Sequence, residues 1–178
     1  MEKEILKYIE LNDLNSAFKL IVKQYSQQVY WQVRRMVLIH EDADDVTQNI
    51  FIKIFQHLGE FRKESKLSSW IYRIAYNESL NFIQKRAKEI HQSTDEYAAQ
   101  VVDHLEEDPY FTGDEAELKL QKAIASLPEK QRIIFMMKYY DDLKYEEISS
   151  ILNTSVGALK ASYHHAVKKI EQLILETD

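Results

Sequence analysis

Apolar residues recur at helical spacing through the first half of the chain. Between Ile5 and Leu38 they follow one another in steps of three and four residues, the period of one face of an α-helix. Residues 42–58 form the most strongly amphipathic stretch, and Gly59 follows it as a predicted left-handed C-cap. The apolar face of this stretch consists of Val46, Ile50, Phe51, Ile54, Phe55 and Leu58. The pattern predicts a helical domain over residues 1–90.

A second helical domain is predicted over residues 118–178, where four amphipathic stretches are separated by short breaks. Pro128 is expected in the first turn of one of these helices. Residues 145–170 have the pattern of a helix-turn-helix, with Asn153 at the turn and Thr154 or Ser155 as the cap of the second helix. A plain helical hairpin is the alternative, because any helix pair joined by a small turn resembles this motif.

The net charge of −6 is distributed unevenly along the chain. Residues 1–90 have a net charge of +2 and residues 118–178 a net charge of +1. Residues 91–117 contain nine acidic residues and no Lys or Arg, together with Pro109 and Gly113. This composition predicts an acidic linker between the two domains. A solvated loop with no further role is the alternative.

Composition excludes several classes of fold and site. Three glycines and two prolines are too few for a hairpin-rich β protein, and the glycines lie too far apart for a phosphate-binding loop. The absence of cysteine removes disulfides, thiolate metal sites and cysteine nucleophiles. No stretch approaches the ~18 apolar residues of a membrane span, and residues 1–13 lack the apolar segment of a secretory signal. We therefore expect a cytoplasmic all-α protein without membrane insertion.

Aromatic and basic residues alternate between positions 61 and 89. The aromatic residues are Phe61, Trp70, Tyr72, Tyr76 and Phe82, and the basic residues are Arg62, Lys63, Lys66, Arg73, Lys85, Arg86 and Lys88. This combination is typical of proteins that bind unpaired nucleic acid, because cations contact phosphates and rings stack on exposed bases. The alternative is a helix in which Trp70, Ile71 and Ile74 are core residues and the basic residues form a solvated face.

No catalytic or metal site is expected. Asp44 and Asp45 are adjacent, so on a helix they point about 100° apart. No histidine lies three or four residues after them to complete a metal site. His164 and His165 are likewise neighbours that do not share a helix face. We therefore expect no enzymatic activity, no cofactor and no small-molecule substrate.

Three motifs in order resemble the extracytoplasmic-function (ECF) group of bacterial sigma factors. DADDVTQNIFIKIFQHL (42–58) resembles the helix that binds the clamp helices of the largest RNA polymerase subunit. FRKESKLSSWIYRIAYNESLNFIQKR (61–86) resembles the segment that melts and reads the −10 promoter element. The segment from LPEKQRIIF (127–135) through YEEISSILNTSVGALKASYHHAVKKI (145–170) resembles the domain that reads the −35 element. The resemblance covers nearly the whole chain.

The resemblance implies a transcription initiation factor whose partners are core RNA polymerase, promoter DNA and an anti-sigma factor. The polymerase-binding residues are then Asp44, Asp45, Gln48, Asn49 and Lys53. Those at −10 DNA are Arg62, Lys63, Lys66, Arg73, Tyr76, Asn77, Lys85 and Arg86. Those at −35 DNA are Ser155, Ala158, Lys160, Ser162, His164, His165 and Lys168. The acidic linker is expected to pass through positively charged channels of the polymerase.

The recognition helix departs from the family in one respect. Many relatives carry arginines after the position of Lys160, whereas this chain continues with Ala161, Ser162, Tyr163 and His164. The bidentate contact between arginine and guanine is therefore absent from this helix. We expect weak DNA binding without polymerase. The alternative function is a stand-alone helix-turn-helix regulator that binds duplex DNA.

Overall fold

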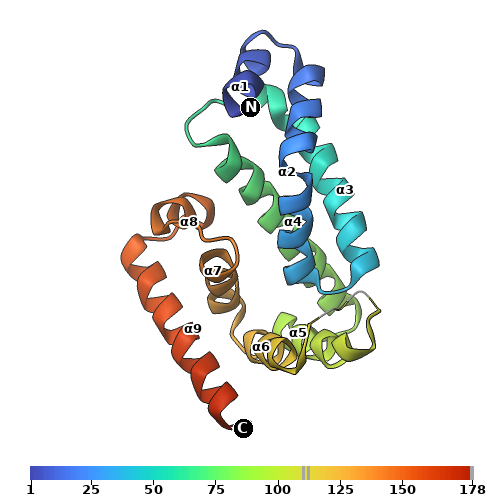
Figure 1. Ribbon diagram of the computed structural model, residues 1–178, viewed down its shortest axis with the longest axis vertical. Helices are drawn as coiled ribbons and strands as arrows, with labels where there is room; N and C mark the ends of the chain where they lie inside the picture. Colours follow the sequence, from blue (N-terminus) through green and yellow to red (C-terminus); the bar gives the residue numbers. More distant parts are fainter. Residues whose placement is uncertain (110, 112, 177–178) are drawn as a thin grey trace. The chain divides into compact units, whose positions relative to one another are not determined.

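The computed structural model describes residues 1–109, 111 and 113–176, and all regular secondary structure among them is helical (Figure 1). The elements are α1 (Glu2–Glu10), α2 (Leu14–Val37), α3 (His40–His57), the 3-10 turn η1 (Leu58–Glu60), α4 (Leu67–Glu89), α5 (Thr94–Asp103), the 3-10 turn η2 (Leu105–Glu107), α6 (Glu115–Ala125), α7 (Glu129–Tyr139), α8 (Tyr145–Leu152) and α9 (Val156–Glu176). The predicted all-α class is confirmed.

The chain forms two compact units, Met1–Asn81 and Phe82–Asp178. In the first unit, α2 packs against α3 and against α1. Its core is formed by side chains that are at most 4% exposed: Ile5, Ile21, Tyr25, Val29, Val33, Val46, Ile50, Ile54, Ile71 and Ala75. The ring of Phe18 lies 5.0 Å from that of Phe55, in an edge contact between α2 and α3.

Helix ends in the first unit follow from local chemistry. The Asp13 carboxylate accepts a hydrogen bond from the backbone N–H of Ser16 (3.1 Å) and so caps α2. Leu38 ends α2 in the left-handed conformation, with φ 69°. The prediction for Gly59 is wrong: no described glycine has a positive φ, and Gly59 lies within η1. The chain continues from α3 into this tighter turn, which keeps Leu58 fully buried.

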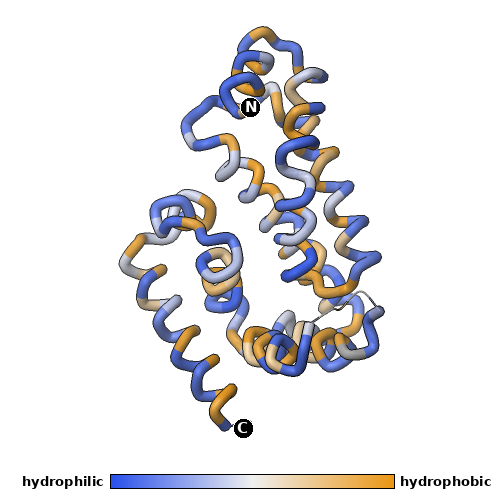
Figure 2. Tube along the Cα trace, viewed as in Figure 1, coloured by the Kyte–Doolittle hydropathy of each residue, from blue (hydrophilic) through white to orange (hydrophobic). Residues whose placement is uncertain are grey.

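The second unit is built around α9, which packs against α6, α7 and α8. Leu159, Ala166 and Ile170 are the buried residues of α9, as predicted, and Figure 2 shows hydrophobic positions recurring along this helix. They pack in a core with fully buried side chains of α7 and α8, including Ile134 and Ile148.

The acidic segment contains the helix α5. Ser93 and Glu96 form a reciprocal capping box at its start, and Val102 is buried at its end. Helix α5 packs against α6. The predicted acidic linker of residues 91–117 therefore contains a capped helix with a buried apolar side chain.

The helix-turn-helix has the predicted turn. Asn153 ends α8 in the left-handed conformation (φ 50°, ψ 47°). The hydroxyl of Ser155 accepts a hydrogen bond from the N–H of Ala158 (3.3 Å), so Ser155 rather than Thr154 caps α9. Pro128 precedes α7 as its N-cap residue, one position before the predicted first turn.

The left-handed turn allows a stability prediction. Asn153→Ala is expected to lower the unfolding free energy by ~1 kcal/mol, because a Cβ disfavours this conformation and alanine lacks the local hydrogen bonding of asparagine. Asn153→Gly is expected to preserve or raise stability. Urea unfolding followed by circular dichroism measures both variants. Equal losses for alanine and glycine would show that the amide side chain matters, rather than the backbone conformation.

Candidate nucleic-acid interface

Helix α3 separates a buried face from a polar face. Val46, Ile50 and Ile54 are at most 4% exposed. The predicted polymerase-binding residues Asp44, Asp45, Gln48, Asn49 and Lys53 are all exposed on the remaining surface of the helix. The structure therefore places these five residues together.

Two of these residues already have partners within the chain. Lys53 forms an ion pair with Glu78 of α4 (2.6 Å), which joins α3 to α4. Asp44 lies 3.4 Å from Nε2 of His40, whose Nδ1 is 2.7 Å from the hydroxyl of Tyr30 on α2. Both contacts fix side chains at the border of the polar face, so Asp45, Gln48 and Asn49 are its more adaptable members.

Sequence reasoning missed an apolar component of this surface. Ile52 is 54% exposed on α3, one turn after Gln48 and Asn49. Phe55, predicted in the buried face, is 40% exposed although its ring contacts Phe18. The signal was present, because Ile52 interrupts the polar positions at helical spacing. Exposed apolar side chains beside polar ones are typical of protein interfaces.

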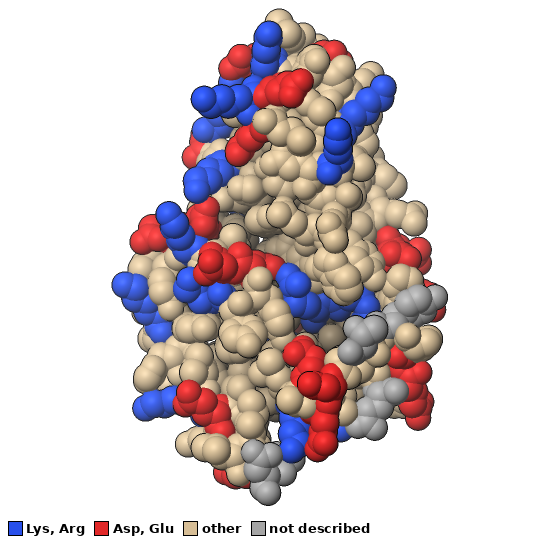
Figure 3. All heavy atoms as spheres, in the orientation of Figure 1, with Lys and Arg blue, Asp and Glu red and all other residues tan. Residues whose placement is uncertain are grey.

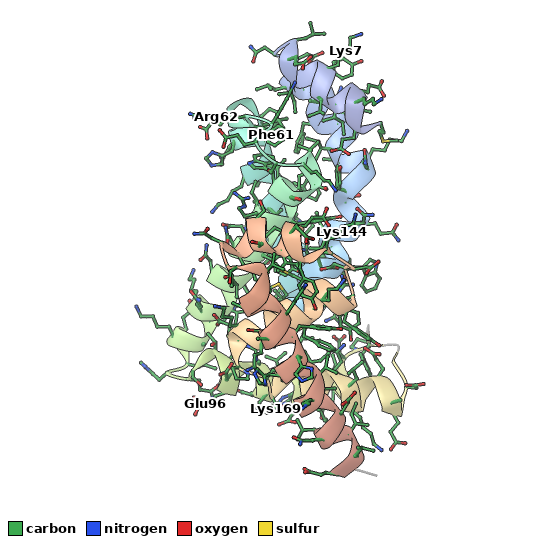
Figure 4. All side chains as sticks on the ribbon, turned by 90° about the vertical axis from the view of Figure 1, so that its left-hand side faces the viewer. Lys7, Phe61, Arg62, Glu96, Lys144 and Lys169 are labelled. Carbon is green, nitrogen blue, oxygen red and sulfur yellow. The ribbon has the colours of Figure 1, made fainter. Side chains whose placement is uncertain are left out.

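The loop between η1 and α4 presents three basic residues. Arg62, Lys63 and Lys66 are all exposed, and Figure 4 labels Arg62 beside Phe61 at this loop. Lys63 has a left-handed backbone (φ 59°) and forms an ion pair with Glu10 of α1. Three of the predicted −10 cations thus gather in one loop that is joined to α1.

Tyr76 requires a correction. Its side chain is only 1% exposed, so in this structure the ring has no surface on which a base could stack. It shares the buried side of α4 with Ile71, Ala75 and Ser79, whose hydroxyl donates to the carbonyl of Ala75 (2.8 Å). Trp70, expected as core, is half-buried and contacts Phe61 with ring centroids 5.3 Å apart.

The other predicted −10 residues on α4 are divided between the two units. Asn77 is exposed and Arg73 half-buried one turn earlier, both within Met1–Asn81. Lys85 and Arg86 are exposed in the second unit, and the Arg86 guanidinium lies 5.2 Å from the centre of the Phe82 ring.

Helix α9 exposes most of the predicted −35 residues. Lys160, His164 and Lys168 are spaced by four residues and form one exposed row. Ala158 and His165 are also exposed, whereas Ser162 is half-buried and Ser155 serves as the cap. Lys169 instead donates to the carbonyl of Ser126 (3.1 Å) and so anchors α9 to the end of α6 (Figure 4).

Arg132 joins three parts of the second unit. Its Nη1 donates to the carbonyls of Ala125 (3.1 Å) and Leu127 (3.0 Å), and its Nη2 lies 3.3 Å from the carboxylate of Asp95 on α5. Burial lowers the pKa of Arg132, and the Asp95 carboxylate opposes this shift.

Basic and acidic side chains share the surface of the described residues. Figure 3 shows Lys and Arg intermixed with Asp and Glu over the described part of the face in view. Within the described ranges, no group of three or more His, Cys, Asp or Glu side chains is arranged to hold a metal ion. The described helices include none that is long and apolar enough to cross a membrane.

Comparison with known proteins identifies the family. Residues 21–89 match the family description "Sigma-70 region 2", and residues 117–170 match "Sigma-70, region 4". The ECF RNA polymerase sigma factor SigW of Bacillus subtilis is 30% identical over 172 residues, which cover 92% of this chain and 91% of SigW. The chain belongs to the ECF sigma factors. It is a promoter-directing factor whose partners are core RNA polymerase and promoter DNA.

Other relatives agree with this assignment. The ECF RNA polymerase sigma-E factor of Escherichia coli is 29% identical over 173 residues, covering 89% of this ECF sigma factor and 86% of sigma-E. Among solved structures, RpoE of Bartonella quintana in complex with the anti-sigma factor NepR has a TM-score of 0.68 at 19% identity, covering 88% of this chain and 96% of RpoE. CnrH in complex with the cytosolic domain of CnrY has a TM-score of 0.66 at 18% identity, covering 92% of this chain and 90% of CnrH. These two structures support the fold.

The matched regions locate the candidate surfaces of this ECF sigma factor. Region 2 contains the polar face of α3 and the basic loop before α4, and region 4 contains the helix-turn-helix. Helix α5 lies between the two matched regions. The family assignment also favours a polymerase-dependent factor over the stand-alone regulator.

Proposed function

We propose that promoter initiation is divided among three surfaces of this ECF sigma factor. The polar face of α3 binds core polymerase, the basic loop and exposed residues of α4 hold the unpaired −10 strand, and the exposed row of α9 contacts the −35 element. The observation that carries this proposal is the presence on α3 of a buried face and of a face that exposes Asp45, Gln48 and Asn49.

Docking through α3 fits the chemistry of its surface. The exposed amides of Gln48 and Asn49 lie one turn before Ile52, which is 54% exposed, and the exposed carboxylates of Asp44 and Asp45 lie one turn earlier still. An interface of this kind combines an apolar contact with a rim of polar groups that select a partner of complementary charge. A basic helical partner, as the family resemblance implies for the polymerase clamp, meets both requirements.

A charge reversal on α3 tests the polymerase assignment. Asp45→Lys is expected to weaken binding to core polymerase by about 10-fold, because it places like charges opposite each other at the interface. Gln48→Ala is expected to weaken binding less. Both substitutions should impair polymerase binding before they impair promoter melting. Fluorescence anisotropy with labelled protein and core polymerase measures the affinity.

The matched control for this test is Glu4→Lys, which makes the same charge change at an exposed position of α1. It should leave polymerase affinity unchanged. Equal weakening by Asp45→Lys and Glu4→Lys would attribute the effect to net charge and contradict a specific site on α3.

The −10 surface consists of Arg62, Lys63, Lys66, Arg73, Asn77, Lys85 and Arg86, without the buried Tyr76. Cations at a melted strand contact phosphates and oppose re-annealing.

At the −35 element, the second helix of a helix-turn-helix enters the major groove with its N-terminal part. The residues that then lie at or beside DNA are Ser155, Ala158, Lys160, Ser162, His164, His165 and Lys168.

We further propose that this chain acts in the cytoplasm, has no catalytic activity of its own and is held inactive by an anti-sigma factor. Complexes of RpoE with NepR and of CnrH with CnrY support the last point by analogy. Residues 91–117 are proposed to pass through positively charged channels of the polymerase when the holoenzyme forms.

Run-off transcription tests the whole assignment. Core polymerase with this protein should initiate at discrete sites in genomic fragments, whereas core polymerase alone should not. A gel-shift experiment with and without polymerase separates the rival function. A tight, sequence-specific shift by the isolated protein would favour a stand-alone duplex-binding regulator.

A further inference from the structure

Four aromatic side chains of α7, α8 and α9 form a cluster of ring contacts in the second unit. Phe135 of α7 stacks on Tyr139 (centroids 5.1 Å apart) and on Tyr163 of α9 (5.9 Å). Tyr163 in turn contacts the ring of Tyr145 at 6.4 Å in an edge arrangement. Tyr145 is the first residue of α8, so this cluster connects the two helices of the motif through their rings.

Two lysines lie over the ring of Tyr145. The ammonium of Lys138 is 5.5 Å from its centre and that of Lys160 is 5.7 Å away, both within the range of cation–π attraction. Lys160 and Tyr163 are three residues apart on α9, so they occupy adjacent turns of one side. Tyr145 therefore contacts α9 at two successive turns.

The two lysines differ in how their charge is used. Lys138 donates to the carbonyl of Leu143 (3.2 Å) and pairs with Asp142 (3.7 Å), so its charge is compensated within the α7–α8 loop. Among the residues that the structure describes, no carboxylate pairs with Lys160, which is exposed. Lys160 is thus held by a ring while its charge stays available for an external anion.

Tyr145 is itself fixed in place. The carboxylate of Glu147 accepts a hydrogen bond from the N–H of Lys144 (3.0 Å) at the start of α8, one residue before Tyr145 (Figure 4). The edge contact with Tyr163 restrains the ring from the side of α9. A restrained ring can confine the long side chain of Lys160, which then loses less conformational freedom when it binds.

We propose that Tyr145 is a positioning residue that holds the ammonium of Lys160 toward the DNA backbone at the −35 element. This inference rests on the proposed −35 role of α9. Tyr145 acts through the face of its ring, and its hydroxyl donates no hydrogen bond to any residue in the described part of the chain. Phenylalanine should therefore replace it.

A double-mutant cycle in the holoenzyme tests this. Core polymerase with each variant is titrated with promoter DNA that carries either an intact or a scrambled −35 element. Lys160→Ala and Tyr145→Leu are each expected to weaken binding to the intact promoter by about two- to five-fold. This factor corresponds to the interaction strength of an exposed cation–π contact. The double variant should bind no more weakly than Lys160→Ala, and Tyr145→Phe should bind like the unsubstituted protein.

Controls separate positioning from folding and from general charge. Lys130→Ala removes an exposed lysine of the same unit and should leave binding unchanged. Thermal unfolding and polymerase affinity should be the same for Tyr145→Phe and the unsubstituted protein. If Tyr145→Leu unfolds the unit, Tyr145→Phe is compared with Tyr145→Trp instead. Tyr145→Trp keeps an aromatic ring and enlarges it. Both variants should retain the contribution of Lys160 to binding.

The outcomes distinguish the inference from the function on which it rests. Additive losses for Tyr145→Leu and Lys160→Ala, or a loss for Tyr145→Phe equal to that for Tyr145→Leu, would overturn the positioning role while leaving −35 binding intact. If the holoenzyme with the unsubstituted chain does not distinguish intact from scrambled −35 DNA, the proposed function of α9 fails and the positioning role fails with it.

Discussion

Replacing Arg62, Lys63 and Lys66 together with alanine is expected to reduce open-complex formation by about 10- to 100-fold while polymerase binding changes little. Three cations are removed from one exposed loop, and each phosphate contact that is lost lowers the salt dependence of binding to single-stranded DNA by about 0.7 in logarithmic slope. The slope should therefore fall by about 2. Permanganate footprinting across a salt series, with holoenzyme at saturation, measures the extent of open-complex formation and its dependence on salt.

The chain offers a matched control for this prediction. Lys3, Lys7 and Lys23 are exposed on α1 and α2, and their replacement by alanine removes the same net charge. Because Lys63 already pairs with Glu10, its single replacement should cost less than that of Arg62. Equal losses of polymerase binding and open-complex formation would contradict the division between α3 and the basic loop.

Arg132→Ala is expected to destabilise the second unit by about 2–5 kcal/mol. The substitution leaves the carbonyls of Ala125 and Leu127 without a donor, and each buried acceptor left unsatisfied costs about 1–3 kcal/mol. Asp95→Asn should cost under ~1 kcal/mol, because the Asp95 side chain is 53% exposed and its ion pair is screened by water. Lys130→Ala, at an exposed neighbouring position of α7, serves as the control.

The positions of the two tryptophans make this measurement specific. Trp31 and Trp70 both lie in Met1–Asn81, so their fluorescence reports unfolding of the first unit. Circular dichroism reports helix loss in both units. Arg132→Ala should shift the dichroism transition to lower urea and leave the fluorescence midpoint nearly unchanged. Equal shifts of both signals would show that the units unfold together and that Arg132 stabilises the whole chain.

Local signals in the sequence were sufficient for the helix-turn-helix. Asn153 tolerates a left-handed backbone, Ser155 is a good N-cap, and the buried residues of α9 follow the period of a helix. Each signal involves only residues that are close in sequence, so it does not depend on tertiary packing. The prediction of this motif therefore needed no knowledge of the core.

Periodicity was less informative where a helix is buried over a wide arc. One line of α4 holds four side chains that are at most 1% exposed: Leu67, Ile71, Ala75 and Ser79. Tyr76 is buried beside them. A serine among the buried residues and an aromatic ring next to basic residues conceal this face in the sequence. Composition indicated nucleic-acid binding for the segment, but it did not determine which rings point inward.

The structured acidic segment illustrates a different limit. Ser93 and Glu96 are a capping-box signal for α5, but the prediction for this segment rested on its acidic composition alone. What stabilises α5 is tertiary: its packing on α6 and the pairing of Asp95 with Arg132. Such contacts join residues distant in sequence and leave no local pattern.

If residues 91–117 pass through the polymerase channels as proposed, α5 would make the enthalpy of loading depend on temperature. An extended path through the channels of the enzyme would require α5 to unwind and expose Val102, which is 1% exposed here. Newly hydrated apolar surface raises the heat capacity of a complex, in opposition to the decrease that interface burial brings. The enthalpy of loading would then vary with temperature in a way that a permanently extended tether would not impose.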